Sequence, residues 1–179
     1  MPDRLTLILS EIQRRGGIGR GDIAVAIAHA QQFVDAAGDP DTMIDLGSGG
    51  GLPGLVLAVR LPTVAVTLIE RRAKRADLLR YGVHALDLSS RVQVVESDVR
   101  TFAQTAVPVD LVTARSFAAP VQVLTLASPL LREGGMLLVS EPPSSPQDRW
   151  DGDVAGSLGF RDLGQQGAVR RWARHTRFT

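Results

Sequence analysis

The sequence predicts an α/β fold in which helices cover both faces of a mostly parallel β-sheet. Short apolar segments alternate with helical segments from residue 42 onward, and a glycine-rich loop joins the first of these strands to a helix. This alternation is typical of parallel sheets that are buried on both faces. The length of 179 residues suits one domain, so we expect residues 1–179 to form a single unit.

Residues 1–41 are expected to form two helices ahead of the sheet. Apolar residues recur at helical spacing over residues 5–12, and Asp3 is placed to cap this first helix. Four glycines then interrupt the chain between residues 16 and 21. A second helix is predicted over residues 22–37, followed by a glycine that stops it.

Residues 42–141 are expected to form the core that binds a cofactor, and residues 142–179 a loop and C-terminal strands. In the core, the pattern predicts strands over residues 43–46, 64–69, 92–95, 109–113 and 136–139. It predicts helices over residues 53–60, 72–86 and 121–131, and a turn at Gly134–Gly135. Pro53 occupies the first position of the first of these helices. Beyond the core, it predicts an exposed loop over residues 142–146 and strands near residues 158–163 and 168–178.

The composition excludes several classes of protein. The chain has no cysteine, which excludes disulfides, thiolate zinc sites and a cysteine nucleophile. No apolar run approaches the ~18 residues of a membrane span, and the first residues lack the layout of a signal peptide. The histidines show no spacing that suggests a catalytic triad or a metal site. We therefore expect a cytoplasmic protein with no membrane partner and no metal.

The formal net charge is only +1, but basic residues are concentrated in two segments. One spans residues 71–80 and the other spans residues 161–177, and arginine dominates both. Because phosphate contacts are local, such segments allow a nearly neutral protein to bind a polyanion. A solvated helix face explains the same pattern equally well.

The glycine loop, Asp45-Leu46-Gly47-Ser48-Gly49-Gly50-Gly51-Leu52-Pro53-Gly54, is the most informative segment. It follows a predicted strand and opens a predicted helix, which is the context of a nucleotide-binding loop. The next strand ends in Glu70, where an acid accepts hydrogen bonds from both hydroxyls of a ribose. The loop and Glu70 together predict a site for an adenosine-type ligand.

Two ligand classes compete for this loop. A dinucleotide places its pyrophosphate at the helix N-terminus, and Asp45 would repel that group. An acid two residues before the first glycine instead suits a ligand with an ammonium group, such as the methionine part of S-adenosylmethionine. Asp98, after the third strand, is a candidate partner for the adenine amino group, and it is equally a good helix N-cap.

Segments from residue 42 to residue 140 resemble one known family. Residues 44–54 look like the first motif of the ribosomal small-subunit methyltransferase G family, also called the glucose-inhibited division protein B family. Leu68-Ile69-Glu70 with Lys74-Arg75 is similar to its second strand and basic helix, and residues 113–118 to its segment after strand four. His29 matches a histidine that the family carries on the helix before the first strand.

The resemblance implies the class I methyltransferase fold, a Rossmann-like sheet of seven strands, with S-adenosylmethionine as cofactor. It implies methyl transfer to N7 of a guanine in 16S ribosomal RNA, with that RNA or the 30S subunit as partner. The loop and the resemblance together give these candidate cofactor-binding residues: Asp45, Gly47, Gly49, Leu52, Glu70, Asp98, Val99, Arg100 and Arg115.

Arg115 is also the candidate catalytic residue on the substrate side, where it would bridge the cofactor carboxylate or a phosphate. A structural salt bridge is the alternative role for it. Guanine N7 carries a free lone pair and needs no strong base, so catalysis would rest on positioning and desolvation.

The sequence departs from the family pattern at three places, one of which is its Arg-rich terminal strand. The N-terminal helical region lacks the family's Asn-Leu-Thr segment, and Ser140-Glu141-Pro142-Pro143 stands where the family has a Lys-Gly pair. Glu141 in place of a cation is expected to invert the charge beside the substrate pocket. The alternative function is a divergent paralogue that binds S-adenosylmethionine but methylates another substrate or is not catalytic.

Overall fold

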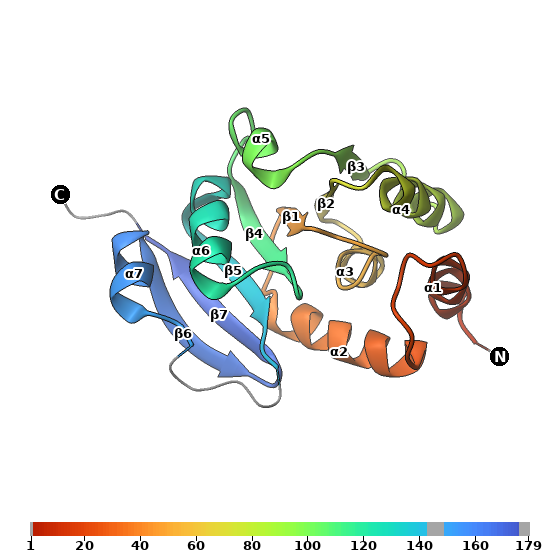
Figure 1. The fold of residues 1–179 in the computed structure, drawn as a ribbon, viewed down its shortest axis with the longest axis horizontal. Coiled ribbons are helices and arrows are strands. Elements are labelled where there is room, and N and C mark those ends of the chain that lie inside the picture. The colour runs from red at the N-terminus through yellow and green to blue at the C-terminus, as the bar shows by residue number, and fades with distance from the viewer. Residues whose placement is uncertain (1, 143–148, 176–179) are drawn as a thin grey trace.

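The structure, a computed structural model, describes residues 2–142 and 149–175, and shows a seven-stranded β-sheet between two layers of helices (Figure 1). The strands are β1 (Thr42–Leu46), β2 (Ala65–Glu70), β3 (Val92–Glu96), β4 (Val109–Ala114), β5 (Leu131–Ser140), β6 (Phe160–Gln166) and β7 (Val169–Arg174). The helices are α1 (Arg4–Arg14), α2 (Ile23–Ala36), α3 (Gly54–Arg60), α4 (Ala73–Ala85), α5 (Val99–Ala103), α6 (Pro120–Ala127) and α7 (Gly152–Ser157), with a 3₁₀ turn at Ser128–Leu130.

The strand order is β3-β2-β1-β4-β5-β7-β6. The first five strands pair in parallel, and β7 pairs antiparallel with both β5 and β6. The chain builds outward from β1 through β2 to β3 and then returns to place β4 on the other side of β1. Ligands of open α/β sheets bind beyond the carboxyl ends of the strands at such a switch point. The topology therefore predicts a ligand-binding site at the carboxyl ends of β1, β2 and β4.

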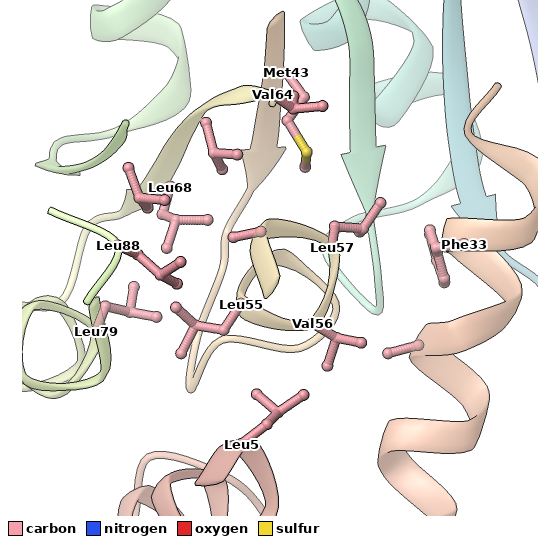
Figure 2. Close-up of a cluster of buried hydrophobic side chains, with 14 of the residues drawn as sticks. Leu5, Phe33, Met43, Leu55, Val56, Leu57, Val64, Leu68, Leu79 and Leu88 are labelled. Carbon is pink, nitrogen blue, oxygen red and sulfur yellow. The ribbon is translucent and has the colours of Figure 1, made fainter. Parts of the chain in front are cut away.

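Alternate residues of the parallel strands enter two separate cores. Met43 of β1 packs with α1, α2, α3 and α4, and the next residue, Ile44, packs with α5, α6 and α7 on the opposite face. Figure 2 shows α3 inside the first core, where Leu55 and Leu57 lie between the sheet and the neighbouring helices. The central strands are thus apolar on both faces, which is why their segments lack polar alternation.

The helix starts largely agree with the predictions. Asp3, Asp22 and Asp98 each accept a hydrogen bond from a backbone N–H in the first turn of α1, α2 and α5. Gly38 has a φ of +68° just beyond α2, which suits a glycine stop. Pro53 differs slightly, because it occupies the N-cap of α3 and the helix begins at Gly54.

The predicted helix over residues 121–131 and the turn at Gly134–Gly135 need correction. The α-helix ends at Ala127 and passes through the 3₁₀ turn into β5, which begins at Leu131 and includes both glycines. The pairing of β4 with β5 shifts between Val109 and Leu111, so the glycines lie in an irregularity within the strand. Gly135 comes so close to the Asp110 backbone that a side chain there would lie 3.1 Å from its carbonyl oxygen.

The C-terminal strands complete the same sheet. Helix α7 precedes them and was not predicted. In β7, Val169 is buried in the first core and Trp172 in the second, so the strand is covered on both faces. Most of the predicted loop at residues 142–146, and the end of the strand predicted to residue 178, lie outside the described residues.

Residues 2–142 and 149–175 contain neither a membrane-spanning helix nor a cluster of metal ligands. No helix there is both long enough and apolar enough to span a membrane. The same ranges contain no group of three or more acidic or histidine side chains that is arranged to hold a metal ion.

Candidate functional site

The glycine loop lies where β1 turns into α3. Gly47 has a φ of +63°, and a side chain there would collide with the ring of Phe117. Only glycine combines this backbone conformation with this close approach. The Ser48 backbone N–H donates to the carbonyl oxygen of Ile69 at 2.8 Å, which fixes the loop against the end of β2.

Glu70, the last residue of β2, bonds directly to the loop. Its Oε2 accepts a hydrogen bond from the Gly49 N–H at 3.0 Å, and its Oε1 accepts one from the Arg72 N–H at 2.8 Å. The residue is only 5% exposed, yet it lines a cavity. Each carboxylate oxygen has a second lone pair. The carboxylate therefore supports the loop and retains acceptor capacity for a ligand.

The first cavity encloses about 410 Å³ at the carboxyl ends of β1, β2 and β3. Predicted residues Gly47, Glu70, Asp98, Val99 and Arg100 line it together. The Asp98 carboxylate caps α5 through the Arg100 N–H at 2.8 Å and also faces the cavity, so its two candidate roles are compatible. Ser116 and Phe117 belong to the segment over residues 113–118 but were not predicted as site residues, and they complete the wall beside Gly47.

A second cavity of about 520 Å³ adjoins the first. The two share Gly47, Arg75 and Ser116. The predicted residues Gly49, Leu52 and Arg115 lie here rather than in the first cavity. A ligand longer than a nucleoside can therefore extend from one cavity into the other, past Gly47.

The N-terminal segment forms the opposite wall of the second cavity. Residues 17–22 line it together with Gln13 and the α2 residues Val25, Ala26 and His29. The prediction assigned residues 1–41 only to helices ahead of the sheet and missed this wall. The four glycines between residues 16 and 21 were the available signal, because such clusters let a backbone pass close to another segment.

Asp45 is not in the wall of either cavity. It is 1% exposed and lies beneath the loop, where its Oδ1 accepts a hydrogen bond from the Thr113 hydroxyl at 2.6 Å. The structure therefore does not bring Asp45 to the position where a ligand's ammonium group would meet it. Burial raises the pKa of Asp45 to about 6, although the Thr113 hydrogen bond opposes the shift.

Replacing Asp45 by Asn should remove a pH dependence of stability. The pKa of Asp45 is higher in the folded protein than its ordinary value of 3.8, so folding favours the protonated form. The stability from this group is full below about pH 4 and is lost as the pH rises through 6. The free energy of unfolding of wild type minus that of Asp45→Asn should fall by about 2 kcal/mol between pH 4 and pH 7. Urea denaturation across this range measures it, and a constant difference would contradict it.

Arg115 follows β4 and is half-buried in the second cavity. Burial lowers the pKa of its guanidinium from the ordinary value, and the nearby Asp45 carboxylate opposes that change. The Asp45 carboxylate is thus close enough to influence this guanidinium, although Asp45 itself lines neither cavity. Arg115 lines the second cavity, and both roles considered for it stay predictions.

The sequence suggested that Glu141 inverts the charge beside the substrate pocket. The structure contradicts this prediction. Glu141 is 5% exposed, lines neither cavity, and its carboxylate accepts a hydrogen bond from the Trp150 indole N–H. Its other oxygen lies 3.3 Å from the Arg149 guanidinium. Residues 149 and 150 are distant from the family motifs, so the sequence alone gave no sign of this structural pairing.

Glu141→Lys, which restores a cation at this position, should destabilise the protein. The change removes the acceptor of the Trp150 indole and places a second cation beside Arg149. Breaking a buried ion pair in this way costs about 3–5 kcal/mol. Chemical denaturation of the variant, with the exposed Glu133→Lys as a matched control, tests this expectation. Equal stability of the two variants would assign Glu141 no structural role.

The structure distinguishes the two basic segments. Arg71, Arg72 and Arg75 line the first cavity, so part of the segment at residues 71–80 borders the site. In the C-terminal segment, Arg170 pairs with Asp162, and Arg174 donates to backbone carbonyl oxygens of its own neighbourhood. Among the described residues of the two segments, only those of the first line the two cavities.

Comparison with solved structures shows the class of fold. An O-methyltransferase family protein from Burkholderia thailandensis matches with a TM-score of 0.66 and 19% identity, over 86% of this chain and 58% of that chain. The SAH-bound methyltransferase PaMTH1 of Podospora anserina matches with a TM-score of 0.67 and 14% identity, over 99% and 89%. At these identities the likeness shows the fold, which is that of the class I methyltransferases, as predicted.

Sequence comparison identifies the family. The family model described as rRNA small subunit methyltransferase G matches residues 23–145. The ribosomal RNA small subunit methyltransferase G of Rhizorhabdus wittichii is 34% identical over 122 residues, 65% of this chain and 55% of that protein. Its counterpart in Rhodopseudomonas palustris is 41% identical over 116 residues, 63% and 49%. The chain therefore belongs to the rRNA small subunit methyltransferase G family, and it spans about half the length of these curated relatives.

Methyltransferases of this family use S-adenosylmethionine, and the residues present fit that cofactor. In the first cavity Glu70 retains acceptor capacity of the kind that ribose hydroxyls need, and Asp98 and Val99 line the same cavity. The shared boundary at Gly47 gives the methionine part a path into the second cavity. The dinucleotide alternative is not supported by the family to which the chain belongs.

Proposed function

We propose that this protein transfers a methyl group from S-adenosylmethionine to N7 of a guanine in 16S ribosomal RNA. The observation that carries the proposal is the pair of adjoining cavities at the carboxyl ends of β1, β2 and β4. One contains an acid suited to a ribose, and the other is bordered by cations. Membership of the rRNA small subunit methyltransferase G family supplies the substrate class.

The protein's own residues would act mainly by positioning. Glu70 would accept hydrogen bonds from the ribose, and the backbone of residues 47–51 would pass beside the methionine part. Arg115 would attract its carboxylate or a substrate phosphate. When bound, S-adenosylmethionine supplies a methyl group activated by its sulfonium. Holding the acceptor nitrogen about 3 Å from that carbon, away from water, then provides most of the rate enhancement.

The partner would be 16S RNA, either alone or within the 30S subunit. Arg71, Arg72 and Arg75 lie at the edge of the first cavity, and Arg20 lies at the edge of the second. These cations suit contacts with RNA phosphates on either side of the acceptor nucleotide, and such contacts weaken as salt rises.

A labelling experiment tests the function. Methyl-tritiated S-adenosylmethionine is incubated with the protein and with 30S subunits, or protein-free 16S RNA, from bacteria that lack their own enzyme of this family. We expect label in 7-methylguanosine after digestion to nucleosides, and reverse-transcription mapping then identifies the position. Cofactor binding by calorimetry, with NAD as the comparison ligand, is measured in parallel. Tight binding of S-adenosylmethionine without labelled RNA would favour the divergent paralogue, and binding of NAD alone would overturn both readings.

A further inference from the structure

The second cavity has a wall that the cofactor does not require. Residues 17–22 form this wall, and the Gln13 side-chain amide holds them by donating to the carbonyl oxygens of Gly19 and Gly21 at 2.8 and 2.9 Å. The same segment packs directly on the glycine loop, since a side chain at Gly50 would lie 2.6 Å from the Gly17 carbonyl oxygen. The wall is therefore fixed relative to the cofactor loop.

The lining of this cavity suits a flat ring that carries phosphates. Ile18, Val25 and Leu52 supply apolar surface, and Val25 is 67% exposed. The charged side chains that face it are Arg20, Asp22, Arg75 and Arg115, with His29 beside them. Three guanidinium groups against one carboxylate favour an anionic ligand, and the apolar surface favours an aromatic ring within it.

His29, on α2, contributes an imidazole ring whose charge and tautomer follow from its surroundings. Its Nδ1 is buried and has no hydrogen-bond partner. Burial and the neighbouring Arg115 both lower the pKa of His29, which favours the neutral ring. A proton on Nδ1 would be a buried donor without an acceptor, so the neutral ring carries its proton on Nε2. Nε2 is then the N–H donor of this ring, and His29 is one of the residues that line the second cavity.

We propose that the second cavity holds the acceptor base, and that the Nε2–H of His29 donates a hydrogen bond to guanine O6 and thereby selects guanine. This inference rests on the proposed function and names the base-binding part of the same site. It makes His29 a specificity-determining residue.

The edge chemistry of purines explains the selection. Guanine presents N7 and O6 as acceptors on one edge, and adenine presents N7 with an amino donor in place of O6. A donor beside the cavity therefore accepts guanine and rejects adenine while N7 faces the methyl group. In the transfer, N7 supplies the electron pair of the new bond to carbon, the carbon–sulfur pair stays on sulfur, and no proton leaves. The base gains positive charge, which a neutral His29 tolerates better than a cationic one.

Nuclear magnetic resonance tests the contact independently of activity. The chain has three histidines, and His29→Gln identifies the ¹⁵N signals of His29 in protein saturated with S-adenosylhomocysteine. GMP and IMP, which carry O6, should shift the Nε2–H signal of His29. The 5′-monophosphate of 2-aminopurine riboside, which lacks O6, should not. Equal shifts with all three nucleotides, or no shift with any, would overturn the inference.

Kinetics provide a second readout. His29→Ala should lower kcat/KM for the RNA about 10- to 100-fold and leave the affinity for S-adenosylmethionine within twofold of wild type. His29→Gln, which keeps an N–H donor, should recover part of the loss. His84→Ala, an exposed histidine on α4, is the matched control. An equal loss of cofactor affinity would assign His29 to the cofactor instead and contradict the inference.

The two proposals can fail separately. If RNA is methylated and His29 does not respond to GMP, the base contact is wrong and the proposed function stands. If no RNA is methylated and His29 still distinguishes GMP from the 2-aminopurine nucleotide, the proposed function fails and the base site stands.

Discussion

Glu70→Ala should weaken the binding of S-adenosylmethionine about 10- to 100-fold, because the carboxylate has two tasks. It would accept the ribose hydroxyls, and it already accepts hydrogen bonds from the Gly49 and Arg72 backbone N–H groups. Its removal leaves these donors without a protein partner and frees the loop at the ligand. The loss of such hydrogen bonds amounts to about 1–3 kcal/mol. Isothermal titration calorimetry measures it directly.

The matched control for this prediction is Glu96→Ala. Glu96 ends β3, directly beside Glu70 in the sheet register, and its exposed carboxylate interacts with Arg80. It lines neither cavity. We therefore expect Glu96→Ala to bind the cofactor within twofold of wild type. Unchanged affinity in Glu70→Ala, or an equal loss in both variants, would remove Glu70 from the cofactor site.

Gly50→Ala should disrupt the junction between the cofactor loop and the N-terminal segment. The added methyl group would collide with Ile18 and would lie 2.6 Å from the carbonyl oxygen and 2.8 Å from the carbonyl carbon of Gly17. Rotation of a side chain relieves the first collision but not the backbone ones, so the two segments must separate. Overpacking of this kind costs about 1–3 kcal/mol. Chemical denaturation should show that loss, together with a raised KM for RNA.

Gly19→Ala is the control for stability within the same wall. A side chain at Gly19 would meet no atom within 4 Å, and its backbone needs no positive φ. Its free energy of unfolding should stay within about 0.5 kcal/mol of wild type. If Gly50→Ala is as stable as Gly19→Ala, the N-terminal segment does not pack on the loop in solution, and the second cavity lacks its outer wall.

Local signals predicted the elements that carry the site. The loop from Asp45 to Gly54 lies between a strand and a helix, as its glycines indicated. Glu70 ends the next strand and contacts that loop through Gly49, and Asp98 caps α5 beside them. These features depend on a few consecutive residues and on the parallel direction of the strands. Parallel strands bring their carboxyl ends to one edge, so position along the sequence was sufficient to group them.

Position along the sequence was not sufficient to predict which way a side chain points or which distant residues it contacts. Asp45 belongs to the predicted motif, but it faces the first core and bonds Thr113, 68 residues away. Glu141 finds its partners in Arg149 and Trp150, beyond the last parallel strand.

The sequence by itself determined the parallel sheet, the loop, the acid at the end of β2 and the resemblance to the methyltransferase family. Only the tertiary structure decided which of these residues reach a cavity, and that residues 17–22 and His29 complete the second one. The physical reason is that spacing and propensity act within one element, while the packing of separate layers determines which side chains are buried and which face a ligand.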